Sequence, residues 1–91
     1  MDAILFSNEG CGSCKTWKPT FIRLMERYGL DYQVIDLYKN KELKDKYGVV
    51  GIPYTVFLDD EGNEVGSILG NMIEELAIRE IEGYIRKCKK G

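Results

Sequence analysis

The chain has 91 residues, enough for one domain with a single core but too few for two domains. Its 44% hydrophobic and 31% charged residues are ordinary for a soluble globular protein, and a net charge of −2 gives no reason to expect nucleic acid as a partner. No apolar run approaches the roughly 20 residues that cross a bilayer. Because the N-terminus has the pattern of a strand rather than of a signal region, we expect a cytoplasmic protein without a membrane partner. We also expect a monomer.

The first half of the chain predicts a strand followed by a long helix. Asp2–Phe6 is mostly apolar and predicts a short buried strand. From about Cys11 to Tyr28 the apolar residues follow a helical period, and Gly29 suits the C-terminal cap of that helix. Pro19 lies inside the predicted helix and should kink it, because proline lacks a backbone donor.

A second strand and a short helix follow, and then a hairpin. The hairpin strands flank a tight turn rich in Asp, Gly and Asn. The predicted elements are a strand at Tyr32–Leu37, a helix at Asn40–Tyr47 closed by Gly48, and strands at Tyr54–Leu58 and Glu64–Leu69.

The last predicted element is a helix at Met72–Cys88. Asn71 is expected to cap it, and Glu74 to reach back as in a capping box. Its expected apolar stripe consists of Ile73, Leu76, Ala77, Ile81, Tyr84, Ile85 and Cys88. Because Cys88 falls on this stripe, we interpret it as a small buried hydrophobic residue.

This order, β-α-β-α-β-β-α, predicts an α/β fold. The first β-α-β unit should be parallel and right-handed, and the hairpin adds two antiparallel strands. The result is a four-stranded mixed sheet with helices on both faces, formed by residues 1–91 as one domain. The start of the long helix then lies at the carboxyl end of the first strand, where open α/β sheets place their sites.

Two cysteines stand at the start of the long helix, in the segment Cys11-Gly12-Ser13-Cys14. Unpaired N–H groups and the helix dipole stabilise a thiolate at a helix N-terminus. Such sites lower a cysteine pKa from about 8.5 to roughly 3.5–7.5. Cys14 lies one turn later on the same helix face, and Lys15 and Lys18 add positive charge. Cys11 is therefore the predicted nucleophile and Cys14 the resolving thiol.

Other roles for the two cysteines fit the sequence less well. Zinc takes four ligands, whereas the chain has no histidine and only one other cysteine, Cys88, so we predict no metal site. A structural disulfide with so short a loop would constrain the unfolded chain little. Two inert buried thiols remain an alternative, but a Cys-x-x-Cys pair in a cytosolic protein is more often catalytic.

Three separated segments resemble the thioredoxin/glutaredoxin superfamily. Cys11-Gly12-Ser13-Cys14-Lys15 is similar to the thioredoxin active site, with Ser13 in place of the usual proline. Pro19, five residues after Cys14, matches the kink proline of the active-site helix. Tyr47–Thr55 resembles the segment that leads to the cis-proline loop. The resemblance covers nearly the whole chain and implies a thioredoxin fold with dithiol–disulfide oxidoreductase activity.

The chain departs from the thioredoxin pattern in two ways. First, it lacks the extra N-terminal strand and helix, which makes it a minimal thioredoxin-like protein of glutaredoxin size. It also differs from glutaredoxins, because Asn71 and Met72 replace the acidic pair with which glutaredoxins hold glutathione.

The second departure from thioredoxins concerns a buried charged pair. Leu5 and Val34 stand where thioredoxins have a buried aspartate and its lysine partner. Losing both members of such a pair can be nearly neutral, and deprotonation of Cys14 must then be assisted by water or by the Cys11 thiolate.

The resemblance also assigns a substrate groove. Gly12, Ser13, Ile52 and Pro53 are expected to contact the substrate, with a cis Ile52–Pro53 bond that leaves the Ile52 backbone free for an extended substrate chain. Tyr54, the residue after this proline, is interpreted as an ordinary strand aromatic.

We therefore expect an enzyme that reduces protein disulfides without a cofactor other than its own disulfide. A flavin reductase of the thioredoxin-reductase type, or another dithiol donor, would regenerate it. The alternatives are a glutathione-dependent glutaredoxin, a carrier of an iron–sulfur cluster or metal, and a redox-sensing interaction module.

Overall fold

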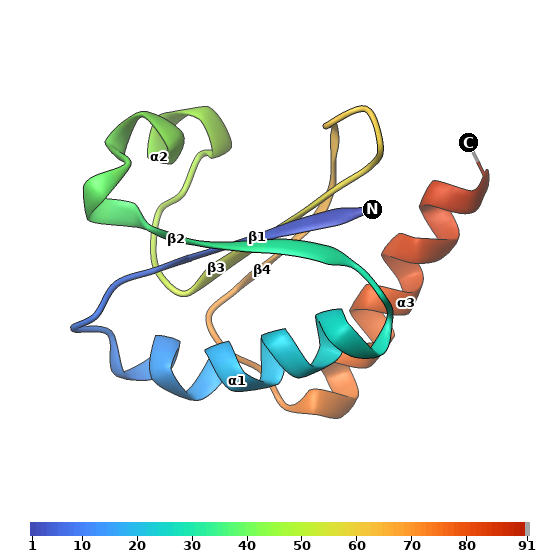
Figure 1. Cartoon of the computed structure of the whole chain (residues 1–91), viewed down its shortest axis with the longest axis horizontal. Helices are drawn as coiled ribbons and strands as arrows, with labels where there is room; N and C mark the ends of the chain where they lie inside the picture. The colour runs from blue at the N-terminus through green and yellow to red at the C-terminus, as the bar shows by residue number, and fades with distance from the viewer. Residues whose placement is uncertain (91) are drawn as a thin grey trace.

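The computed structural model describes residues 1–90, and its elements follow the predicted order (Figure 1). The sheet has the strand order β2-β1-β3-β4, with β1 parallel to β2 and antiparallel to β3. The elements are β1 (Asp2–Ser7), α1 (Gly12–Arg27), β2 (Asp31–Asp36), the short 3₁₀ helix η1 (Leu37–Lys39), α2 (Lys41–Tyr47), β3 (Tyr54–Leu58), β4 (Glu64–Leu69) and α3 (Glu74–Lys90).

The central strand β1 contributes side chains to a core on each face of the sheet, because successive side chains of a strand point to opposite faces. Ala3 and Leu5 pack with buried residues of α1 and α3, whereas Ile4 and Phe6 belong to a second cluster under α2. Figure 1 shows the same arrangement, with α1 and α3 on one side of the sheet and α2 on the other. The predicted mixed sheet with helices on both faces is confirmed.

Helix α1 is the element that carries the two cysteines. Its buried side chains are Cys14, Trp17, Phe21, Leu24 and Met25. The chain leaves the helix through Gly29, whose φ of +63° suits glycine because it has no Cβ. Pro19 lies within the helix, which continues without interruption through it.

A buried hydrogen bond ties α1 to β3. The indole Nε1–H of Trp17 donates to Oγ1 of Thr55 at 2.9 Å, and both side chains are fully buried. Trp17 thus belongs to the core on the α1 side of the sheet.

The start of the last helix differs from the prediction. α3 begins at Glu74, two residues later than expected, and Asn71 does not cap it. The Ile73 carbonyl accepts the first helical hydrogen bond, from the N–H of Ala77. The Glu74 carboxylate, instead of reaching back to the helix start, accepts from Arg23 of α1 at 2.7 Å. An ion pair between helices has replaced the capping box.

The predicted apolar stripe of α3 is also partly wrong. Ile73 precedes the helix and is 64% exposed, and Leu76 is 46% exposed, whereas Ala77 and Ile81 carry the contact with the sheet. Cys88 is only half-buried and lies outside both cores. A stripe inferred with the wrong helix start includes residues that face solvent.

The second strand ends one residue earlier than predicted. Leu37 begins η1, because the side chain of Asp36 accepts from the Tyr38 N–H at 2.9 Å and caps this short turn. Within residues 1–90, no helix is both long enough and apolar enough to cross a membrane.

Candidate active site

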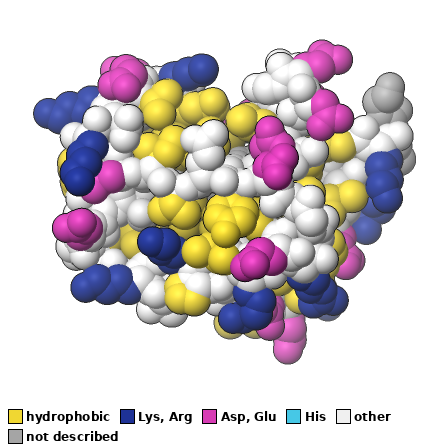
Figure 2. Space-filling view, in the orientation of Figure 1, with side chains coloured by type: hydrophobic (Ala, Val, Ile, Leu, Met, Phe, Trp, Pro, Cys, Tyr) yellow, Lys and Arg dark blue, Asp and Glu magenta, His cyan; other side chains and the backbone are white. Residues whose placement is uncertain are grey.

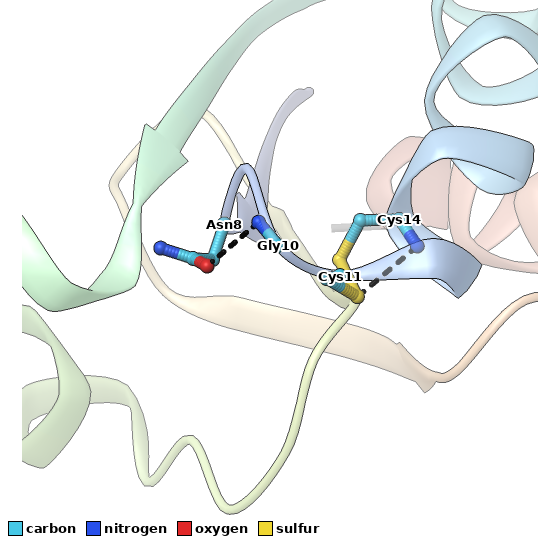
Figure 3. The surroundings of a disulfide bond; sticks show 4 residues. All are labelled: Asn8, Gly10, Cys11 and Cys14. Atoms are coloured by element: carbon cyan, nitrogen blue, oxygen red, sulfur yellow. Dashed lines mark hydrogen bonds between the residues drawn. A yellow bond between two sulfur atoms is a disulfide. The ribbon is translucent and has the colours of Figure 1, made fainter.

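The turn between β1 and α1 positions the first cysteine. The side-chain oxygen of Asn8 accepts from the Gly10 N–H at 3.0 Å, and its backbone oxygen accepts from the Cys11 N–H at 3.1 Å. Figure 3 shows how this turn leads directly into the helix at Cys11. Asn8 is well suited to this place, because asparagine side chains readily hydrogen-bond to the backbone two residues on.

Cys11 and Cys14 form a disulfide at the start of α1, with their Cα atoms 5.2 Å apart. Cys11 is the N-cap residue of the helix, and its sulfur accepts from the Cys14 N–H at 3.1 Å (Figure 3). Cys11 is partly exposed, whereas Cys14 is only 2% exposed. The accessible sulfur is therefore the one that receives a helix N–H, which stabilises a thiolate there.

The buried cysteine, Cys14, borders a cavity of about 270 Å³ between α1 and the carboxyl end of β2. The other residues of its wall are Ser7, Asn8, Glu9, Lys15, Lys18, Val34, Asp36 and Lys39. Three lysines and two carboxylates thus line this cavity together with Cys14.

Two apolar side chains lie next to each other on the sheet behind the disulfide. Leu5 of β1 pairs in register with Val34 of β2, and Leu5 is fully buried. By the resemblance to thioredoxins, these are the positions of a buried aspartate and its lysine partner. The register places the two positions side by side in the sheet. Neither Leu5 nor Val34 has an ionisable side chain, so neither residue can accept the proton of Cys14.

The proline loop reaches the same end of the sheet as the disulfide. Phe6 pairs with Tyr54, so Pro53 stands beside the end of β1 from which the cysteine turn leaves. The Ile52–Pro53 peptide bond is cis, as predicted, and the Pro53 carbonyl accepts from the Gly70 N–H at 2.7 Å. In Figure 3 the loop that leads into β3 runs toward Cys11. Within residues 1–90, no hydrogen bond uses the N–H or C=O of Ile52.

The remaining predicted site residues fall into two groups. Gly12 and Ser13 are exposed beside the disulfide, in a position to meet a substrate, although no hydrogen bond joins the Ser13 hydroxyl to Cys11 in the part described. Tyr54 packs against the core under α2, as expected for a strand aromatic. No group of three or more His, Cys, Asp or Glu side chains within residues 1–90 could hold a metal ion.

Sequence reasoning missed one feature beside the site. A groove between α2 and the proline loop includes Lys41 and Lys44 from the helix and Val50 and Ile52 from the loop. The two lysines are three residues apart, the spacing that puts side chains on one helix face, and this was the available signal. The pairing of this face with the loop required the tertiary fold.

Comparisons with known proteins concern the fold that carries this site. The Thioredoxin family model matches residues 3–82. Thioredoxin 1 of Thermosipho africanus superposes with a TM-score of 0.84 at 26% identity, and the match covers 98% of this chain and 99% of that one.

Two curated relatives differ in length. A prophage-derived thioredoxin-like protein of Bacillus subtilis is 28% identical over 79 residues, covering 84% of this chain and 94% of that protein. A chloroplastic thioredoxin-like protein of Arabidopsis thaliana is 26% identical over 80 residues, but the match spans only 31% of its length. The similarity therefore concerns the domain that carries the cysteine pair.

Proposed function

The chain belongs to the thioredoxin family, and we propose that it reduces disulfides of other proteins by dithiol exchange through Cys11 and Cys14. A thiol–disulfide oxidoreductase is what the family and the cysteine pair together support. One observation supports Cys11 as the residue that attacks the substrate disulfide. The sulfur that is open to solvent, Cys11, accepts the N–H of Cys14 at the N-terminus of α1. That arrangement stabilises the thiolate needed for attack.

The proposed reaction has two exchange steps. In the reduced protein the Cys11 thiolate attacks one sulfur of the substrate disulfide, forming a mixed disulfide and releasing the other substrate sulfur as a thiolate. Cys14 then loses its proton and attacks the Cys11 sulfur. The bond between Cys11 and the substrate breaks, the second substrate thiolate leaves, and both substrate thiolates take up protons. Two electrons have passed to the substrate, and the Cys11–Cys14 disulfide has formed.

The second step requires a proton acceptor for Cys14. Leu5 and Val34 cannot serve, so we propose that the proton passes to water in the cavity beside Cys14. The ammonium groups of Lys15 and Lys18 on the cavity wall favour the resulting thiolate, because opposite charges nearby stabilise it.

The proline loop supplies the proposed binding edge for the substrate. Since the Ile52 backbone has no partner within residues 1–90, it can pair with an extended substrate segment as an added strand would. Gly12 and Ser13 border the same opening and have little side chain to obstruct the substrate.

We further propose that a dithiol donor of the thioredoxin-reductase type regenerates the protein in the cytoplasm, and that the protein acts as a monomer without a cofactor. The loop after β4 supports a dithiol donor rather than glutathione. Asn71 and Met72 there carry no charge that could hold the ionic ends of the tripeptide.

An insulin-reduction assay tests the function and the donor together. Precipitation of the insulin B chain would be followed with NADPH and a thioredoxin reductase, and in parallel with NADPH, glutathione and glutathione reductase. We expect turnover with the first system and little with the second. Turnover with glutathione alone would identify a glutaredoxin, and no turnover with either system or with dithiothreitol would contradict the proposed activity.

A further inference from the structure

A groove with a volume of about 560 Å³ lies beside the proline loop, between that loop and the segment formed by η1 and α2. Its walls are formed by Leu37, Tyr38, Lys41, Lys44, Asp45, Val49, Val50, Gly51 and Ile52. Val50 is 85% exposed and Tyr38 is 63% exposed, so both are accessible to a substrate at the groove. Because Ile52 belongs to the wall, the groove continues directly from the proposed substrate edge.

The charges of the groove are unbalanced in favour of lysine. Lys41 and Lys44 face a single carboxylate, Asp45, and the cavity beside Cys14 adds Lys15, Lys18 and Lys39 against Glu9 and Asp36. Each of the two openings is therefore lined by more lysines than carboxylates. Neither Lys41 nor Lys44 forms a salt bridge within residues 1–90.

The segment from the turn between β3 and β4 to the middle of α3 has the opposite character. Residues 59–82 contain eight Asp and Glu residues and a single Arg. In Figure 2, Asp and Glu side chains gather over the turn between β3 and β4, whereas side chains of both signs lie at the side of the molecule that holds α2. The positive groove is thus a local feature of a chain whose net charge is −2. Oppositely charged substrates are steered by such a local field.

We propose that this groove selects protein substrates whose reactive cysteine is flanked by acidic residues. The inference rests on the proposed function and specifies its substrate class. The substrate segment pairs in extended form with the Ile52 backbone, sets an apolar side chain on Val50, and places its carboxylates near Lys41 and Lys44. The lysines are three residues apart on α2, so they present their ammonium groups on one side of the helix.

The test uses three peptides that share one intramolecular disulfide and differ only in the flanking residues, which are Glu, Gln or Lys. Each oxidised peptide is mixed with reduced protein, the reaction is quenched with acid, and the peptide thiols are counted by mass spectrometry. We expect the Glu peptide to be reduced about fivefold faster than the Gln peptide, and the Lys peptide to be slowest. In 0.5 M NaCl the difference should fall below about twofold, because salt screens exposed charges.

Two double variants separate the groove from net charge. Lys41→Gln with Lys44→Gln should lower the preference for the Glu peptide over the Gln peptide from about fivefold to below about twofold. Arg86→Gln with Lys89→Gln changes the net charge equally, at exposed positions on α3, and should preserve the preference. The circular dichroism spectra and melting temperatures of both variants would verify folding.

The outcomes distinguish this inference from the proposed function. Equal rates for the three peptides with wild-type protein, or a preference that survives in the Lys41/Lys44 variant, would overturn the inference and leave the reductase activity standing. If the wild-type protein reduces neither the peptides nor insulin, the proposed function fails and the inference falls with it.

Discussion

Removal of the Thr55 hydroxyl should weaken the connection between the two elements that hold the site. Trp17 lies three residues after Cys14 on α1, and Thr55 lies two residues after Pro53 on β3. Their hydrogen bond of 2.9 Å is fully buried. Thr55→Val keeps the β-branched shape but removes the acceptor, which leaves the indole N–H buried without a partner.

The expected cost follows from the burial of this donor. An unsatisfied buried polar group costs about 1–3 kcal/mol, and the methyl group that replaces the hydroxyl recovers little of it. For a domain of this size each kcal/mol lowers the melting temperature by about 4–8 °C. Urea unfolding at neutral pH, followed by circular dichroism, would measure the free energy of unfolding.

A double-mutant cycle provides the control. Trp17→Phe removes the donor, so adding Thr55→Val to it should cost less than about 0.5 kcal/mol, giving a coupling energy of at least about 0.5 kcal/mol. If Thr55→Val costs the same in both backgrounds, the hydrogen bond does not stabilise the fold and the reasoning is refuted.

Three further predictions concern stability. Leu5→Asp should destabilise the fold by about 3 kcal/mol or more in urea, because the new carboxylate is buried without a cation. Adding Val34→Lys, its neighbour in register, should restore part of that loss, and an unchanged midpoint for Leu5→Asp would contradict the assignment. Gly66→Ala should lower the melting temperature, because its Cβ would collide with the Tyr84 ring, whereas Gly83→Ala, in an open position on α3, should raise it. Burial raises the pKa of Tyr84 to about 12, so the phenol contributes stability that is present below about pH 10 and is lost as the pH rises toward 12. Tyr84→Phe should therefore flatten the decline of the unfolding free energy over that range, and an identical slope would contradict this.

The sequence predicted the elements that have strong local signals. The helical period from Cys11, the glycines at 29 and 48 and the hairpin turn each specify backbone geometry locally, and each is found where expected. The cysteine pair needed no tertiary information, because both residues lie in one helical turn.

The start of α3 could not be predicted in the same way. Asn71 is a good capping residue in isolation, but the Glu74 carboxylate pairs with Arg23, which is 51 residues away in the chain. The groove between α2 and the proline loop forms only where the fold brings the two together, and local sequence patterns do not predict that contact.

The most direct test of the central claim is the mass of a trapped intermediate. Cys14→Ser protein would be incubated with an oxidised peptide, alkylated, digested and analysed by mass spectrometry. The account predicts a stable mixed disulfide between the peptide and Cys11, because the resolving thiol is missing. The matched Cys11→Ser variant should form almost none, since Cys14 is buried. A mixed disulfide that forms equally fast on Cys14 in the Cys11→Ser variant would contradict Cys11 as the nucleophile.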